Sequence, residues 1–395
     1  MSIATKARLY GFGASLGLLV AFGGAQAQET IKLGLSVPLS GAAALWGKGS
    51  EFMCNTAAEE INKAGGVKVG DKTYDFKCIA YDNKYNAAEG TKVAQTLLNR
   101  DGVKFIGGSL GTAPVQALQS LSERQGVLLF TTAWGPSIKG PKFPLTFTQM
   151  STPFEILPPL IRYVHKANPD AKTVVLLNPN DATGQDTEAV AKKVWTETGV
   201  KILSSDFYER GTTEFQPIAA RIASLKPEIV DLGTMPPADA GTVLRELDVL
   251  GWKGVKVVEV GTGVDALKVT GGKAIEDVYM GAAVIFDGPG VSDHQKAVNA
   301  KARELLHESL NSIQIGFYDS VYAIKAGIEK AQSIGPKKVG AVMPQVKFTT
   351  FYGGQIGFHG KDTYGSNQQM ELPVIITQVK DGKLVELSRI SASTN

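Results

Sequence analysis

Short apolar runs alternate with helical patterns through the first third of the chain. The runs that predict strands lie at residues 31–37, 74–81, 103–106 and 127–130. The patterns that predict helices between them lie at residues 49–63, 87–100 and from Thr112 to the stop signal at Gly126. Strands and helices in strict alternation are typical of an open parallel sheet with helices on both faces. We therefore predict an α/β lobe of the doubly wound type.

A second series of the same kind follows residues 145–150, which break the rhythm with alternating hydroxyl side chains. Its predicted strands lie at residues 173–177, 201–205, 228–232 and 255–260. Its predicted helices lie at residues 153–166, 188–198, 215–225 and 240–250. Two α/β lobes of similar build imply a cleft between them, and such clefts are preferred sites for small ligands.

The last third of the chain joins the two lobes. We expect a strand at 282–286, helices at 294–309 and 318–332, a hairpin of 347–351 with 355–358, and a hairpin of 372–380 with 384–387. We assign residues 28–147 and 288–347 to the first lobe, and residues 148–287 and 348–395 to the second. The chain would then cross between the lobes about three times, which makes a hinge that bends without separating them.

Residues 105–135 contain the clearest signal for a site. Glycines 107, 108 and 111 form a glycine-rich turn, and Thr112 with Pro114 is a helix-start signal. Both strands of this β-α-β unit end in small hydroxyl and glycine residues, where ligands bind in such sheets. A helix N-terminus presents unpaired N–H groups and a positive dipole end, so a carboxylate is the expected guest.

The first 27 residues have the pattern of a secretory signal peptide. Lys6 and Arg8 precede an apolar run at 9–22, and Ala25-Gln26-Ala27 matches a small-x-small cleavage site. An uncleaved membrane anchor is the alternative, but the run is broken by glycines and falls short of the ~20 apolar residues that span a bilayer. We expect export to the periplasm and a mature chain that starts at Gln28.

Composition and charge agree with an exported globular protein. The chain has 395 residues, 43% hydrophobic and 20% charged, enough for two separate cores. Loss of Lys6 and Arg8 lowers the formal charge from +3 to +1, and no basic run is present, so we expect no nucleic-acid partner. Cys54 and Cys78 are the two cysteines, which fits one disulfide in an oxidising compartment, with two buried thiols as the alternative.

The sequence offers no pattern for catalysis, a metal or a cofactor. Residues 41–49 look briefly like a phosphate loop, but the spacing before Lys48 is too long and Gly49 stands where Ser or Thr is required. Ser109 has no candidate base nearby in sequence, and none of the four histidines lies at zinc-ligand spacing. We expect a binding protein without cofactor or metal, not an enzyme.

Several segments, in this order, carry a resemblance to a known family. They include IKLGLSVPLSG, AAEEINKAGGV, IGGSLGTAPVQA, TVVLLNPNDATGQD, DFYERGTTEFQPIAARIASLKPEIVDLG and LRELDVLGWKG. Together they resemble the periplasmic solute-binding proteins of ABC importers in the branched-chain amino acid (leucine/isoleucine/valine-binding) family, which have the type I periplasmic binding fold. The resemblance implies a monomer that closes on its ligand and delivers it to a membrane permease, while a partner subunit hydrolyses ATP.

The resemblance also implies which residues contact the ligand. In the first lobe, hydroxyls and backbone N–H groups would hold a carboxylate, and the implied contacts are Trp46, Ser109, Gly111, Thr112, Thr132, Ala133 and Trp134. In the second lobe they are Thr183, Met235 and Thr262.

The chain departs from the amino-acid binders of this family in the second lobe. Residues 234–237, Thr-Met-Pro-Pro, replace an aromatic residue, and residues 261–263 replace the acidic residue that would pair with an α-ammonium group. Either Asp181, Glu259 or Asp265 supplies that charge, or the ligand has no amino group. We favour a carboxylate with an apolar or aromatic body, held between the tryptophans with Met235 as a lid contact. Amino-acid binding for a similar importer, and a ligand-sensing receptor module, remain the alternatives.

Overall fold

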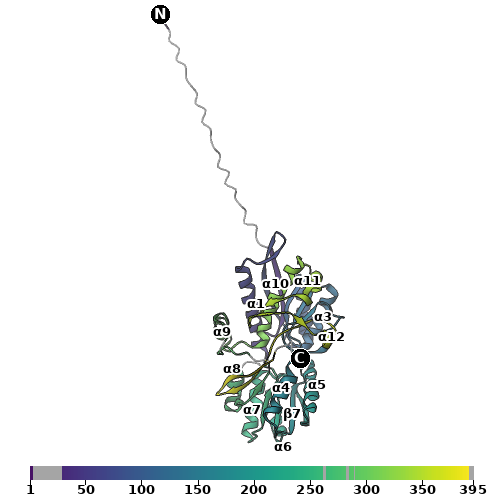
Figure 1. Ribbon diagram of the computed structural model, residues 1–395, viewed down its shortest axis with the longest axis vertical. Coiled ribbons are helices and arrows are strands. Elements are labelled where there is room, and N and C mark those ends of the chain that lie inside the picture. The colour runs from purple at the N-terminus through teal and green to yellow at the C-terminus, as the bar shows by residue number, and fades with distance from the viewer. Residues whose placement is uncertain (3–28, 261–263, 282–283, 289, 391–395) are drawn as a thin grey trace.

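The computed structural model contains two α/β lobes, which lie one above the other along the longest axis of the molecule (Figure 1). Apart from the first two residues, it describes residues 29–260, 264–281, 284–288 and 290–390. The expected signal peptide lies outside these residues. Among the helices described, none is both long and apolar enough to cross a bilayer.

The first lobe is built on an 8-stranded sheet with the order β14-β15-β6-β5-β4-β1-β3-β2. Its central strands β3, β1, β4, β5 and β6 are parallel. The strands are β1 (Glu29–Val37), β2 (Val67–Val69), β3 (Lys72–Asp82), β4 (Phe105–Ser109), β5 (Leu128–Thr131), β6 (Thr146–Thr148), β14 (Phe358–His359) and β15 (Gln369–Met370). The strand order reverses at β1, so the carboxyl ends of β1 and β4 flank a topological switch point.

Helices cover both faces of this sheet. They are α1 (Ala44–Lys63), α2 (Ala87–Gln95) with a π-helical turn at Thr96–Arg100, α3 (Thr112–Gln125), α9 (Asp293–Leu306), α10 (Ser312–Ala331), α11 (Pro336–Val342) and the short α12 (Lys361–Tyr364). A separate small hairpin pairs β12 (Phe348–Thr349) with β13 (Gln355–Ile356), as expected around Gly353-Gly354. Short 3-10 turns lie at Pro136–Ile138 and Met343–Gln345.

The second lobe repeats the design on a 7-stranded sheet with the order β17-β16-β11-β10-β9-β7-β8. Its strands are β7 (Thr173–Pro179), β8 (Lys201–Tyr208), β9 (Ile229–Asp231), β10 (Val255–Val258), β11 (Tyr279–Met280), β16 (Val374–Lys380) and β17 (Lys383–Ile390). Its helices are α4 (Pro153–Ala167), α5 (Ala182–Glu197), α6 (Gln216–Ser224), α7 (Pro237–Val249) and α8 (Val264–Gly271), followed by a 3-10 turn at Gly272–Ile275. The order reverses at β7, so this sheet also has a switch point.

The chain passes between the two sheets after β6, after β11 and after β15. These passages form the expected hinge of three segments, but the lobes divide at a different place. We assigned residues 348–395 to the second lobe, whereas β14 and β15 pair in the first sheet through β6. Gln369 of β15 is also held by Lys139 of the first lobe, with 2.6 Å between Nζ and Oε1. From this segment, β16 and β17 join the second sheet.

Several helices begin earlier than the hydrophobic pattern indicates. We expected α1 to begin near Gly49, but it begins at Ala44 because glycine allows a close approach: a Cβ on Gly47 would lie 1.8 Å from the Pro38 carbonyl oxygen. The early residues of α5 are polar or small, and both α5 and α10 are capped by side chains, those of Asp181 and Asn311, which accept hydrogen bonds from first-turn amides. Of the strand expected at 282–286, residues 282–283 lie outside the described chain, and β11 lies just before it.

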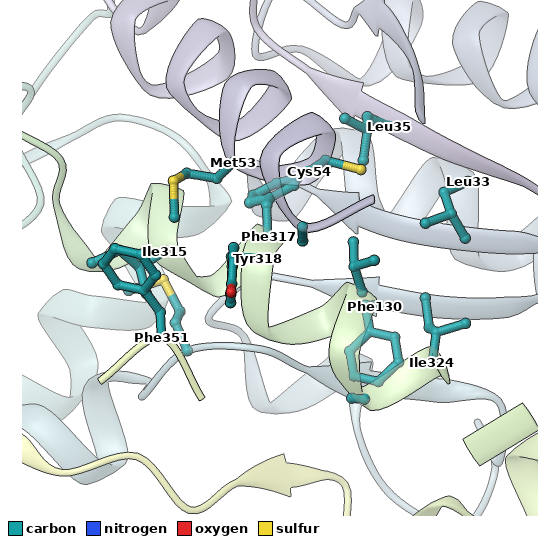
Figure 2. Packing of buried hydrophobic residues seen from close by; sticks show 14 of the residues in the cluster. Leu33, Leu35, Met53, Cys54, Phe130, Ile315, Phe317, Tyr318, Ile324 and Phe351 are labelled. Atoms are coloured by element: carbon teal, nitrogen blue, oxygen red, sulfur yellow. The ribbon is translucent and has the colours of Figure 1, made fainter. Parts of the chain in front are cut away.

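The core of the first lobe explains why its central strand is rich in glycine. Gly107 and Gly108 belong to β4 rather than to a turn, and Phe317 of α10 packs directly on the strand. A Cβ on Gly108 would lie 2.1 Å from the Phe317 ring. Figure 2 shows Phe317 in this cluster with side chains from α1 and the sheet, including Cys54 and Phe130. The packing of α10 against β4 thus fixes the position of the strand and of its carboxyl end.

Cys54 of α1 and Cys78 of β3 form a disulfide, which confirms the prediction and excludes the alternative of two buried thiols. The bond closes a sequence separation of 24 residues within the first lobe. It ties α1, the helix that carries Trp46 in its first turn, to β3 of the sheet.

Candidate ligand-binding site

A small cavity with an accessible volume of about 30 Å³ lies between the lobes. Segments that follow β1, β4 and β5 of the first sheet and β7, β9 and β10 of the second contribute to its walls. It therefore lies outside the carboxyl ends of the strands, next to both switch points, where open α/β sheets bind ligands. The residues that line it are Trp46, Tyr85, Leu110, Gly111, Thr112, Thr132, Ala133, Trp134, Met150, Thr183, Thr234, Val260 and Ile313.

The N-terminus of α3 forms one end of the cavity. Gly111 precedes the helix with a φ of 93°, a conformation that favours glycine, and as the N-cap residue it has no side chain to cap the helix. The neighbouring hydroxyl of Ser109 is buried and has no hydrogen-bond partner among the described residues. The positive end of the helix dipole, next to an unpaired hydroxyl, favours an anion.

The end of β5 is fastened to the end of β4 by hydrogen bonds to Ser109. The carbonyl oxygen of Ser109 accepts from the Thr132 amide at 2.9 Å and from the Thr131 hydroxyl at 3.0 Å. The Thr131 hydroxyl in turn accepts from the amide of Ala133 at 2.9 Å. This network leaves Thr132, Ala133 and Trp134 facing the cavity, so the hydroxyl-rich ends of both strands meet as the sequence indicated.

Thr183 brings the second lobe onto the end of α3. Its hydroxyl oxygen accepts from the Thr112 amide at 3.2 Å and donates to the Thr112 hydroxyl at 3.0 Å. Thr183 lies in the first turn of α5, which is capped by Asp181 through a 2.9 Å bond from the Gly184 amide. Two helix N-termini therefore meet at the cleft, but α5 already has its negative cap, and α3 has none. Of these two helix N-termini, only that of α3, in the first lobe, has no acidic side chain to balance its positive dipole end.

Aromatic side chains form much of the cavity wall. Trp46 lies in the first turn of α1 rather than on a loop, 6.4 Å from the ring of Tyr85. Trp134 lies after β5 and is 5% exposed, with its indole N–H directed to the sulfur of Met150 at 3.5 Å. The Arg210 guanidinium of the second lobe lies 4.2 Å from the centre of the Tyr85 ring and is paired with Asp181. Flat apolar walls of this kind suit a planar or branched apolar body.

The structure brings most of the sequence-predicted contacts together, with exceptions in the second lobe. Met235 does not line the cavity, because its side chain is fully buried in the core of the second lobe with Ala240 and Val243. Its neighbour Thr234 takes the expected place in the wall. Ser109 is buried and does not line the cavity, and Thr262 lies outside the described residues.

None of the three candidate partners for an α-ammonium group lines the cavity. Asp181 is engaged by Arg210 and by the Gly184 amide. Asp265 accepts from Arg303 at 2.7 Å and from the Ser309 amide. Glu259 is fully buried, and its carboxyl group faces Asp231 inside the second lobe. The described lining of the cavity thus contains neither a carboxylate nor a basic side chain.

The Glu259 and Asp231 pair has a consequence for stability. Burial and the neighbouring Asp231 hold the pKa of Glu259 well above its usual 4.5. In the unfolded chain Glu259 ionises above pH 4.5, whereas in the folded chain it ionises only at a higher pH. The folded protein therefore has its full stability below pH 4.5 and loses stability as the pH rises from there toward the folded pKa.

Glu259→Gln should therefore stabilise the protein at alkaline pH and leave it nearly unchanged at pH 4.5. The gain should grow by up to ~1.4 kcal/mol per pH unit until the folded pKa is reached. Thermal unfolding at several pH values measures it, with Glu59→Gln on the exposed face of α1 as the control. Parallel pH profiles for the Glu259 variant and the native chain would contradict the raised pKa of Glu259.

Several cavity residues escaped the sequence analysis. Tyr85 follows β3, and the rule that ligands bind at carboxyl strand ends could have found it. The same rule covers Thr234 after β9 and Val260 after β10. Ile313 comes from the start of α10, far along the chain, and no local pattern marks it.

Two α/β lobes, a hinge of several chain passages and a cavity at both switch points define a ligand-binding protein that closes around a small solute. The model of the periplasmic binding protein family matches residues 30–383, and the chain belongs to this family. The resemblance found in the sequence is thereby confirmed, as are the two-lobed fold and the role as a periplasmic binding protein of the type that serves ABC importers.

Similar proteins agree with this assignment. The leucine-, isoleucine-, valine-, threonine- and alanine-binding protein of Pseudomonas aeruginosa is 25% identical over 336 residues, which cover 85% of this chain and 87% of the relative. A leucine-binding protein from Thermotoga maritima has a TM-score of 0.76 at 18% identity and covers 92% of this chain and 100% of its own. A solute-binding protein of an ABC transporter from R. palustris, in complex with 4-hydroxybenzoate, has a TM-score of 0.76 at 24% identity, with 92% and 97% covered.

Proposed function

We propose that this protein captures a small carboxylate with an apolar or aromatic body and without an amino group, and delivers it to the permease of an ABC importer. The observation that carries this proposal is the distribution of charge around the cavity. The first lobe offers hydroxyls and a helix N-terminus with no acidic residue in its first turn, whereas the described lining has no carboxylate for an ammonium group.

The energetics of desolvation favour the same ligand class. An α-ammonium group that leaves water for this cavity would lose its hydration without gaining a counter-charge, which is costly in a low-dielectric site. A carboxylate would meet the dipole of α3 and the hydroxyls of Thr112 and Thr132, which replace its hydration. The aromatic walls then bury the body of the ligand.

Proteins of this fold that bind each ligand class are known. The R. palustris structures include complexes with 4-hydroxybenzoate and with benzoate, and a Streptococcus pneumoniae relative is in complex with isoleucine. The fold alone therefore admits both classes, and the choice for this chain rests on its own cavity wall.

Transport would follow from lobe closure. The ligand contacts both lobes, so it favours the closed arrangement over the open one. We further propose that the chain is exported with cleavage after Ala27, acts as a monomer in the periplasm, and leaves ATP hydrolysis to a partner subunit of the importer.

A thermal-shift panel tests the ligand class. Benzoate and its hydroxylated derivatives should raise the Tm of the mature protein, because ligand at 100 times its Kd stabilises by about 2.7 kcal/mol. Leucine and valine should have little effect, and benzyl alcohol, which lacks the carboxylate, serves as the matched control. Stabilisation by leucine or valine alone would refute the amine-free ligand, and equal stabilisation by benzyl alcohol would refute the carboxylate.

A further inference from the structure

The second lobe presents one hydroxyl to the cavity that has no hydrogen-bond partner among the described residues. Thr183 uses its hydroxyl to bond Thr112, whereas the hydroxyl of Thr234 is buried, lines the cavity and is unpaired. The whole residue is 5% exposed, so bulk water does not compensate. A buried hydroxyl without a partner costs free energy, which a ligand group of the right kind can recover.

The turn that carries Thr234 is held rigidly. The Gly233 amide donates to Asp231 Oδ1 at 3.1 Å, and the Gly233 carbonyl accepts from the Glu259 amide at 3.1 Å. The Thr234 amide points to Asn178 Oδ1 at 3.4 Å, and the Met235 amide closes the turn. These bonds set the direction of the Thr234 side chain before any ligand arrives.

Gly233 shows how tightly this turn is packed. Its φ is 50°, and a Cβ there would lie 1.9 Å from Asn178 Oδ1, so no other residue fits. The Asp231 carboxylate behind the turn also accepts from the Trp195 indole at 2.8 Å. Asp231, Asn178 and Gly233 thus fix one uncharged hydroxyl at the cavity wall. A hydroxyl held in one position is expected to discriminate between ligands rather than to bind all of them alike.

We propose that Thr234 is a specificity-determining residue, which selects ligands that carry a hydroxyl group on the apolar body. This inference rests on the proposed function, because a carboxylate fixed on the first lobe directs the body of the ligand toward the second. A neutral hydroxyl suits Thr234 because threonine can donate and accept one bond each and brings no charge. An ammonium group would need a counter-charge, and the nearby Asp231 is already engaged.

Isothermal titration of the mature protein tests the proposal with size-matched pairs. The probes are 4-hydroxybenzoate against 4-methylbenzoate and 3-hydroxybenzoate against 3-methylbenzoate, since the ring position that meets Thr234 is set by the ligand pose. The native protein should bind one hydroxylated acid about 10-fold more tightly than its methyl partner. Thr234→Val should reduce that ratio to about 1 without weakening the methyl ligand, and Thr234→Ser should keep the ratio.

The outcomes separate this inference from the proposed function. If the acids bind but Thr234→Val leaves the ratio unchanged, or weakens both members of a pair equally, the role of Thr234 is refuted and the carboxylate site stands. If leucine binds and Thr234→Val weakens it more than its deaminated analogue 4-methylpentanoate, Thr234 recognises an ammonium group instead. If no acid binds the native protein, both proposals fail.

Discussion

Replacing Thr112 by valine should weaken every carboxylate ligand by roughly 10- to 100-fold, whatever the body of the ligand. Valine has the shape of threonine but lacks the hydroxyl, and hydrogen bonds to charged groups contribute about 1.5–3 kcal/mol. The helix itself should be unaffected, because Gly111 and not Thr112 precedes its first turn. Titration with several acids measures the loss, which should be similar for all of them.

The matched control is Thr196→Val on α5, an exposed threonine whose hydroxyl bonds only to its own helix. This variant should bind all ligands as the native protein does. A loss for Thr112→Val that is confined to some acids would contradict a common carboxylate site at α3, and an unchanged affinity would remove Thr112 from the site. In the native protein the Thr112 hydroxyl already bonds to Thr183. The measured loss of affinity is therefore the difference between the bond to the ligand and the bond that it replaces.

Removal of the disulfide should cost about 3 kcal/mol of stability. The bond closes a loop of 24 residues, and the double variant Cys54→Ala, Cys78→Ala would restore the entropy of that loop to the unfolded chain. For a lobe of this size the Tm should fall by roughly 6–12 °C. Thermal and guanidinium unfolding of the purified protein measure the change, and ligand binding at 25 °C should persist because the bond lies away from the cavity.

Reduction of the native protein gives an independent check on the disulfide. A reducing agent should lower the stability of the native chain to that of the double variant and leave the variant unchanged. If the double variant unfolds at the same denaturant concentration as the native chain, the bond contributes nothing to stability. Any stability difference that remains between the reduced native chain and the double variant would report the packing of the buried Cys54 sulfur rather than loop entropy.

The fold could be predicted largely because the hydrophobic runs are short and regularly spaced. Residues 173–177 and 201–205, for example, became β7 and β8, each a residue or more longer at its carboxyl end. Helix starts were harder, since the start of α1 depends on the close approach of Gly47 to Pro38 and that of α5 on the cap from Asp181. β14 and β15 belong to the first sheet because β15 pairs with β6, which is far away in the sequence, and β14 pairs with β15. No local pattern encodes the pairing of β15 with β6.

The first-lobe half of the site followed from one β-α-β unit, because strand ends and a helix start lie together in both sequence and space. Gly111, Thr112 and Trp134 could be named on that ground, and the structure places all of them in the wall. The second-lobe half depends on which way each residue of a turn points. Thr234 and Met235 are neighbours, yet one faces the cavity and the other the core, a distinction fixed by the bracing of Gly233.

The disulfide uses both cysteines that the chain contains. It lies within the first lobe, so opening and closing of the hinge does not strain it. A cysteine introduced on the surface of each lobe would therefore meet no competing thiol, and a pair of spectroscopic labels could report the distance between lobes during ligand capture. This protein can serve as its own conformational sensor with its native cross-link intact.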